Sequence, residues 1–267
     1  MKKNDSHKVT IWILCIIIII QWLYIIATRP KKEEVAVVVP PKPPKQAVIK
    51  GRIAIVLDDW GYNMNNMAIL RQIRHPLTLS VLPNLPYSGE AARQAEALGF
   101  EVILHLPMEP YEKFRLERST ILSSMDEAKI TDILLKDLTD IKYAKGVSNH
   151  MGSKATGDNK VMAVIFTELK KRRLYFLDSF VSTKTIGPKL AKQLGVPFAK
   201  RDVFLDNKPD YGYIKGQLYK LKIKAKNYGQ AIGIGHDREH TLEVLRDLMP
   251  EIEKEGFKFV VVSDLIR

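Results

Sequence analysis

The chain has 267 residues, of which 46% are hydrophobic, and this composition supports a sizeable core and excludes a globally disordered protein. The formal net charge of +12 divides evenly, with six charges in residues 1–50 and six in the rest, and no basic stripe is interleaved with aromatic residues. Nucleic acid is therefore not an expected partner. Cys15 is the single cysteine, so no intramolecular disulfide is expected.

The first predicted element is an uncharged apolar segment, residues 9–27, which follows a basic tail at residues 1–8. A helix of this length can span roughly 30 Å of hydrocarbon. A cleaved signal peptide has a shorter apolar region and a small-residue cleavage site, and neither is evident here. We therefore expect an uncleaved, single-pass membrane anchor. Basic residues lie on both sides of the segment, so they leave its orientation open.

Residues 28–50 are predicted to form a linker. Four of the five residues from 40 to 44 are proline, and lysine, glutamate and valine surround them. A segment of this composition favours extended polyproline II structure and acts as a semi-rigid spacer of about 3.1 Å per residue. The folded domain is expected to begin near Gly51 and to occupy residues 51–267.

From Arg52 onwards, short apolar runs alternate with longer amphipathic stretches, which predicts parallel strands joined by helices. The expected strands are 52–57, 77–82, 101–105, 145–148, 174–177, 230–234 and 258–262. The expected helices are 64–73, 88–98, 126–140, 158–172, 185–194, 214–227 and 239–255. No Gly-x-Gly-x-x-Gly motif follows the first strand, so this α/β pattern favours a β/α barrel over an open dinucleotide-binding sheet.

Polar residues gather at the predicted carboxyl ends of the strands, where a β/α barrel builds its active site. In chain order they are Asp58 and Asp59, His105, Asn149 and His150, Asp178 and Ser179, and His236. Two adjacent carboxylates repel each other unless a cation or a shared proton relieves them, which favours a functional role for Asp58 and Asp59. Asp178 could instead cap the turn after its strand.

The roles of four further residues stay open. Glu109 lies four residues after His105, but two prolines favour extended backbone there, so the spacing does not decide between a metal ligand and a residue that supports one. Arg201 and Asp202 belong to a polar loop that is expected to line the site. Asp206, in the same loop, either lines the site or forms a turn.

One aspartate and two histidines are suitable ligands for a divalent, zinc-like cation, and three protein ligands leave one coordination position open. A second carboxylate can accept a proton from water, and a further histidine can protonate a leaving group. The set therefore fits metal-assisted hydrolysis of an ester or amide. A Gly-x-Ser-x-Gly elbow, a Walker loop and a cysteine cluster are absent, which argues against serine hydrolases, P-loop nucleotidases and structural zinc.

Six motifs, taken in order, resemble those of the divergent polysaccharide deacetylase family. They are Ile-Val-Leu-Asp-Asp-Trp-Gly at 55–61, His-Leu-Pro-Met-Glu-Pro at 105–110, Ser-Asn-His-Met-Gly-Ser at 148–153, Leu-Asp-Ser at 177–179, Arg-Asp-Val-Phe-Leu-Asp-Asn at 201–207 and Ile-Gly-His at 234–236. The resemblance spans essentially residues 52–267. The family is a branch of the NodB-homology carbohydrate esterases, which implies a distorted seven-stranded β/α barrel.

The resemblance also implies roles for the first residues of the site. Asp58 matches the catalytic base and Asp59 the metal ligand of the superfamily's first motif. His105 matches the first ligand of a His-x-x-x-His motif, whose second histidine is replaced by Glu109 in this sequence. His150 is the candidate that completes the ligand set.

His236 resembles the late histidine that serves as general acid in the superfamily, although Asp237 follows it where proline is expected. The remaining residues singled out above are expected to bind substrate or to support the ligands. They are Glu109, Asn149, Asp178, Ser179, Arg201 and Asp202.

The resulting hypothesis is a zinc-dependent deacetylase that acts on an acetylated cell-envelope glycan. Its domain would lie outside the cytoplasm and be held at the membrane by residues 9–27. One alternative is a catalytically silent glycan-binding or envelope-assembly module on the same fold. Another is a different metal-dependent amidase, because a barrel fold alone does not fix the reaction.

Overall fold

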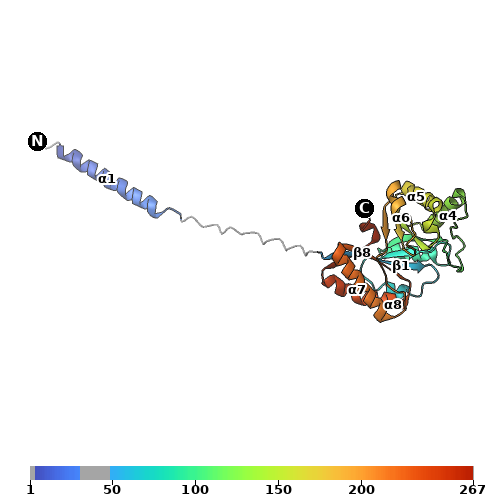
Figure 1. Cartoon of the computed structure of the whole chain (residues 1–267). Coiled ribbons are helices and arrows are strands. Elements are labelled where there is room, and N and C mark those ends of the chain that lie inside the picture. Colours follow the sequence, from blue (N-terminus) through green and yellow to red (C-terminus); the bar gives the residue numbers. More distant parts are fainter. Residues whose placement is uncertain (1–3, 31–48, 267) are drawn as a thin grey trace. The chain divides into compact units, whose positions relative to one another are not determined.

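The computed structural model describes residues 4–30 and 49–266, and the chain divides into two compact units, residues 1–46 and 47–267. The first unit contains helix α1, Asn4–Ala27 (Figure 1). Within the described residues, His7–Ala27 is the one stretch of helix long and apolar enough to cross a membrane, a property that N-terminal signal sequences share. Most of the predicted linker, residues 31–48, lies outside the described residues.

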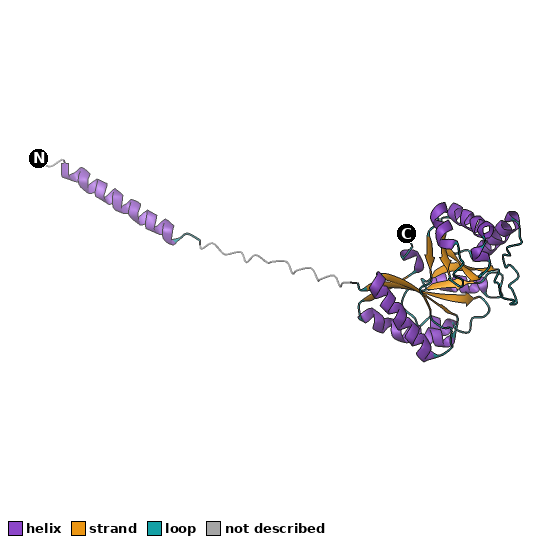
Figure 2. Cartoon of the chain, viewed as in Figure 1, coloured by secondary structure: helices purple, strands orange, loops and turns teal. Residues whose placement is uncertain are grey.

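The second unit is built on one parallel sheet (Figure 2). Its strands are β1 (Gly51–Trp60), β2 (Thr78–Val81), β3 (Glu101–Met108), β4 (Gly146–Met151), β5 (Tyr175–Asp178), β6 (Phe198–Lys200), β7 (Val203–Phe204), β8 (Gln230–His236) and β9 (Phe257–Val260). The strand order is β6-β5-β4-β3-β2-β1-β8-β7, and β9 pairs with the first half of β1. All seven predicted strands are present, and the predicted α/β barrel architecture is confirmed as a curled parallel sheet with helical connections.

Helices connect successive strands, as the sequence pattern predicts. They are α2 (Met67–Leu70), α3 (Ser88–Ala97), α4 (Glu127–Asp140), α5 (Asn159–Arg172), α6 (Gly187–Leu194), α7 (Tyr211–Tyr228) and α8 (Glu239–Lys254), with short 3₁₀ turns at Ala155–Gly157 and Val262–Asp264. Aspartates start three of them: the carboxylates of Asp126, Asp158 and Asp210 accept backbone hydrogen bonds in the first turns of α4, α5 and α7. Helices α4, α5 and α6 pack together over one half of the sheet, and α7 and α8 over the other (Figure 1).

Strands β6 and β7 were not predicted. They have three and two residues, and Lys200, Arg201 and Asp202 interrupt the apolar pattern that marks longer strands. Between them, the backbone N–H of Arg201 donates to Asp178 O of β5 at 3.0 Å, and the N–H of Asp202 donates to Ile232 O of β8 at 2.8 Å. This segment therefore bridges the two sides of the curled sheet.

The alternation of side chains along β1 separates two apolar clusters. Ile53, Ile55 and Leu57 join the cluster that includes the helix residues, whereas Ala54 and Val56 join a second cluster inside the curled sheet. All five side chains are completely buried. By this period of two, a regular strand would turn residue 58 toward the interior and residue 59 toward the helices.

We expect residues 51–267 to fold without the N-terminal segment, because every buried hydrophobic side chain of the described chain lies between residues 53 and 265. A 51–267 fragment should give a single cooperative transition in thermal unfolding followed by circular dichroism. A 62–267 fragment is the matched control. It lacks β1, which pairs with β2, β8 and β9, and it should show no transition. Aggregation of the longer fragment, or folding of the shorter one, would contradict this boundary.

Candidate metal centre and active site

The site begins with a local irregularity at the end of β1. The pairing of β1 with β2 shifts register between Leu57 and Trp60, and Asp59 has a φ of 68°, in the left-handed region that non-glycine residues rarely adopt. As a result both carboxylates approach the same imidazole. His105 Nε2 lies 3.7 Å from Asp58 Oδ2 and 3.3 Å from Asp59 Oδ1.

Asp59, His105 and His150 present three ligand atoms to one point. Asp59 Oδ1 lies 3.3 Å from His105 Nε2 and 3.1 Å from His150 Nδ1, and the two histidine nitrogens are 3.3 Å apart. Ligand atoms bound at about 2.0–2.1 Å to a tetrahedral zinc ion stand roughly 3.3 Å from one another. Within the described part of the chain, this is the one group of three or more ligand-type side chains spaced to hold a metal ion.

Unpaired oxygen atoms also fit a cation at this point. Asp58 Oδ1 and Asp59 Oδ1 are buried and have no hydrogen bond of good geometry among the described residues. Burial raises the pKa of Asp59, but the imidazoles of His105 and His150 outweigh this effect and hold the pKa well below its usual range. The carboxylate is therefore ionised at neutral pH, as a metal ligand must be.

Two serines orient His105. Ser148 Oγ of β4 lies 2.8 Å from His105 Nδ1, and Ser80 Oγ of β2 lies 2.7 Å from Ser148 Oγ. Both hydroxyl groups are buried. Ser148 engages Nδ1 and Ser80 holds Ser148, so that Nε2 faces the carboxylates. Histidine ligands are commonly fixed in this way through the ring nitrogen that does not bind the metal. Ser80 lies in none of the six motifs and was not singled out, whereas Ser148 lies inside the 148–153 motif.

His236 occupies another side of the site. It is the register partner of Asp58 across β1 and β8, and its Nε2 lies 3.9 Å from Asp59 Oδ2. Its Nδ1 is 2.8 Å from Asp206 Oδ1, and its backbone N–H donates to Asp206 Oδ2 at 2.7 Å. Asp206 is completely buried, so its carboxylate holds the imidazole in place. From the sequence, Asp206 could either line the site or form a turn.

The environment shifts the pKa values of this group. Burial lowers the pKa of His236, but the hydrogen bond and the negative charge of Asp206 outweigh it, and the net pKa is raised. Asp58 is 2% exposed, and burial raises its pKa, although the imidazole of His105 opposes this effect. A carboxyl group in this environment holds a proton more readily than an exposed one.

Glu109 does not join the three ligand atoms. Its Oε1 accepts a hydrogen bond from Lys154 Nζ at 2.8 Å, and its Oε2 accepts from Ser123 N at 2.7 Å and from Ser123 Oγ at 2.6 Å. The carboxylate thus ties the loop after β3 to residues 123 and 154.

The other predicted site residues connect the loops around the strand ends. Asn149 Oδ1 accepts from Ser179 N at 2.9 Å, and Asn149 Nδ2 donates to Met151 O at 2.7 Å. Arg201 Nε donates to Ser179 O at 2.7 Å. Asp178 accepts from Phe180 N and Thr185 Oγ1, and Asp202 Oδ2 accepts from Ile232 N. Most of their polar atoms are therefore engaged in hydrogen bonds within the protein.

A cleft of about 860 Å³ opens beside the candidate ligand His150. Its lining comes from the loops after β1, β2 and β3 and from the end of β4: Tyr62, Pro83, Asn84, Leu85, Pro86, Arg115, Leu116, Glu117, Arg118, Ser119, His150 and Met151. The segment 111–119, which supplies five of these residues, was not recognised in the sequence. A molecule that occupies this cleft would contact the candidate ligand His150 directly.

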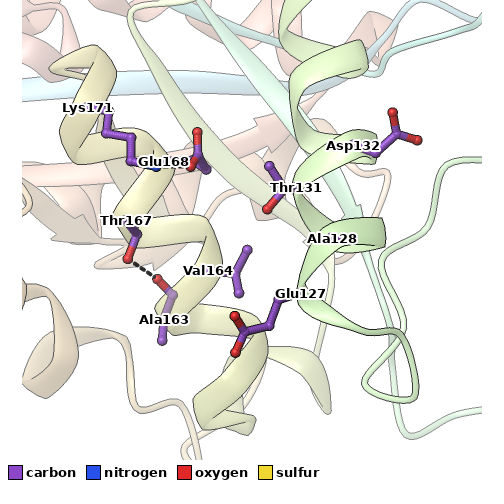
Figure 3. A pocket seen from close by; sticks show the side chains of 9 residues that line it. All are labelled: Glu127, Ala128, Thr131, Asp132, Ala163, Val164, Thr167, Glu168 and Lys171. Carbon is purple, nitrogen blue, oxygen red and sulfur yellow. Dashed lines mark hydrogen bonds and ion pairs between the residues drawn. The ribbon is translucent and has the colours of Figure 1, made fainter.

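A second groove, of about 740 Å³, lies between α4 and α5 (Figure 3). Its walls carry Ala128, Thr131, Ala163 and Val164, with charged side chains such as Glu127 at the rim. None of the candidate site residues lines this groove, so it is not part of the site described above.

Comparison with known proteins agrees with the motif pattern. The family model described as divergent polysaccharide deacetylase matches residues 55–266. The chain belongs to this family. It is 35% identical to the uncharacterised protein YibQ of Escherichia coli K12 over 202 residues, which cover 76% of this chain and 63% of YibQ. The chain thus spans less than two thirds of that relative.

Solved structures share the fold. ATU2773 of Agrobacterium tumefaciens C58, an uncharacterised protein, superposes with a TM-score of 0.76 at 24% identity, over 83% of this chain and 92% of its own. A mutant of BA3943 from Bacillus anthracis, a CE4-family pseudoenzyme with restored enzymatic activity, gives a TM-score of 0.51 at 15% identity, over 82% and 68%. The expected deacetylase fold is confirmed.

We expect the purified protein to bind one divalent cation, and Asp59→Ala, His105→Ala and His150→Ala each to abolish tight binding, because each removes one of the three converging ligand atoms. Elemental analysis after gel filtration measures the stoichiometry. Glu109→Gln is the matched control, since its carboxylate is engaged by Lys154 and Ser123, and it should keep the metal. Metal loss in Glu109→Gln, with stoichiometry retained in two of the alanine variants, would overturn this ligand set.

Proposed function

We propose that the protein is a metal-dependent deacetylase that hydrolyses an acetyl ester or amide on a cell-envelope glycan. The observation that carries the proposal is the arrangement at the strand ends. Three ligand atoms converge within 3.3 Å of one another, and Asp58 and His236 lie next to them. Membership in the polysaccharide deacetylase family supports a carbohydrate substrate.

The residues divide the reaction between them. When bound by Asp59, His105 and His150, a zinc-like ion would activate water and polarise the acetyl carbonyl. Asp58, whose Oδ1 is buried and unpaired, accepts the proton of the attacking water. The curled sheet keeps this carboxylate out of bulk solvent, so the proton transfer takes place in a site with few competing water molecules.

His236 supplies the second proton transfer. Its Nδ1 is held by Asp206, so Nε2 is directed toward the metal ligands, 3.9 Å from Asp59 Oδ2. A protonated imidazole there donates its proton to the leaving oxygen or nitrogen of the sugar. The Asp206 carboxylate favours that protonated form.

We further propose that α1 anchors the protein in a membrane and that the domain acts outside the cytoplasm. The helix is apolar along His7–Ala27 and its described side chains are exposed. An envelope glycan would be reached from that side of the membrane.

A second candidate is a catalytically silent glycan-binding or envelope-assembly module. The observation in its favour is Glu109, which stands at the second histidine position of the superfamily motif and is engaged by Lys154 instead of facing the ligands. The similarity to a CE4-family pseudoenzyme shows that the fold also occurs without activity. Such a module would bind metal and glycan but hydrolyse no acetyl group.

Asp58→Asn and His236→Ala should each keep the metal and lose activity on an acetyl-ester probe or acetylated glycan by about 10²- to 10⁴-fold, the usual contribution of a general base or acid. His236→Ala should impair a glycan more than an activated aryl ester, whose leaving group needs little protonation. His240→Ala, at an exposed histidine on α8, is the control. A wild-type protein that binds metal and glycan and turns over neither probe would establish the silent module instead.

Asp206→Asn should move the basic limb of the pH–rate profile to lower pH. Asp206 raises the pKa of His236, and a general acid is active only below its pKa. With the charge removed, His236 loses its proton at a lower pH, and activity falls earlier as pH rises. The measurement is the profile of kcat/KM, with thermal unfolding to verify that the fold is retained. An unchanged basic limb in a folded variant would refute the assignment of His236 as the acid.

A further inference from the structure

Two arginines line the cleft beside the metal ligand His150. Arg115 and Arg118 come from the loop of residues 111–119, and both side chains are exposed. The part of the chain that the structure describes provides no hydrogen bond to either guanidinium group and no ion pair with it. The cleft therefore presents two positive charges whose donors are available to a ligand.

Glu117 is the one acid among the residues that line the cleft, and its charge leaves the two arginines with an excess of one positive charge. Glu117 lies between the two arginines in sequence, but its Oε1 accepts a hydrogen bond from Tyr62 Oη, from the loop after β1. The remaining lining residues are neutral or carry no negative charge. A neutral sugar needs no such pair of cations, whereas guanidinium groups match the oxygens of a carboxylate or phosphate.

Hydrogen bonds fix the loop that carries the arginines at both of its ends. At its start, Tyr111 N donates to Ser153 Oγ at 2.9 Å, and Ser153 Oγ donates to the Glu112 carboxylate at 2.8 Å. At its end, Asn84 Nδ2 donates to Ser119 Oγ at 3.3 Å. The hydrogen bond between Glu117 and Tyr62 is a third contact that holds the loop. A loop fixed in this way loses less conformational entropy when a ligand binds.

We propose that Arg115 and Arg118 form an anion subsite that recognises a carboxylate or phosphate group on the glycan. The inference rests on the proposed function, which makes this cleft the substrate cleft, and it narrows the substrate class to acidic glycans. Tyr62 also lines the cleft and is exposed, so it offers an aromatic face to a sugar ring.

The test compares acidic and neutral probes on the full-length Asp58→Asn protein in neutral detergent, loaded with zinc, so that binding is measured without turnover. Isothermal titration calorimetry at low salt would use a hyaluronan tetrasaccharide against tetra-N-acetylchitotetraose for the carboxylate, and N-acetylglucosamine 6-phosphate against N-acetylglucosamine for the phosphate. Every probe carries an acetamido group. The two tetrasaccharides also differ in linkage and in the number of acetamido groups, so the contribution of the carboxylate is read from the loss of preference in the arginine variant.

We expect at least one acidic probe to bind about tenfold or more tightly than its neutral counterpart, and the double variant Arg115→Gln/Arg118→Gln to remove most of that ratio, because charge-assisted hydrogen bonds contribute about 10- to 100-fold. Lys113→Gln is the matched control, since this exposed lysine lies on the same loop but does not line the cleft. It should keep the ratio. The pair in which the acidic probe binds more tightly shows whether the subsite recognises a carboxylate or a phosphate.

Equal affinities within both pairs, no binding of either acidic probe, or an equal loss in Lys113→Gln would overturn the anion subsite. The proposed function is tested in a separate assay, which measures hydrolysis of a neutral acetyl ester by the wild-type protein. Hydrolysis with no acidic preference would refute the subsite alone. An arginine-dependent preference without hydrolysis would refute the deacetylase and keep the subsite as a glycan-binding feature.

Discussion

At the end of β1 the backbone of Asp59 turns into the left-handed region, and the two neighbouring carboxylates are thereby brought to one side of the sheet. A non-glycine residue held in this conformation costs about 1–3 kcal/mol, so the surrounding structure must stabilise it. Backbone hydrogen bonds on both sides do so: Asp237 N donates to Asp58 O at 3.0 Å, and Leu82 N donates to Trp60 O at 2.9 Å. Without this bulge, Asp59 would face the helices and the histidines would lack their carboxylate partner.

The parallel sheet supplies the rest of the arrangement. Because neighbouring parallel strands end at the same edge, His105 of β3 and His150 of β4 reach the point to which β1 directs Asp59. The short strand β7 places Asp206 beside the end of β8, where it holds His236. The chemistry of the site thus depends on strand register more than on any single motif.

Seven of the nine strands and the helices between them could be predicted because each is an apolar run or an amphipathic stretch of sufficient length, whereas β6 and β7 are too short to leave such a pattern. His105, His150 and His236 were singled out because the predicted strands end at or just before them, although β3 continues for three residues beyond His105 and β4 for one beyond His150. The left-handed conformation of Asp59 could not be predicted, since a bulge depends on the pairing of β1 with β2 rather than on local composition. Asp206 was left open for a related reason: its partner His236 is 30 residues away in the sequence.

The fully buried Trp60 has a practical consequence. It follows Asp59 directly, and its Nε1 has no hydrogen-bond partner among the described residues. The chain has two other tryptophans, Trp12 and Trp22, and both lie in α1. In a protein without that helix, intrinsic tryptophan fluorescence would come from a single indole ring, directly after Asp59 in the sequence. Fluorescence of the domain would therefore report on changes at the candidate metal centre.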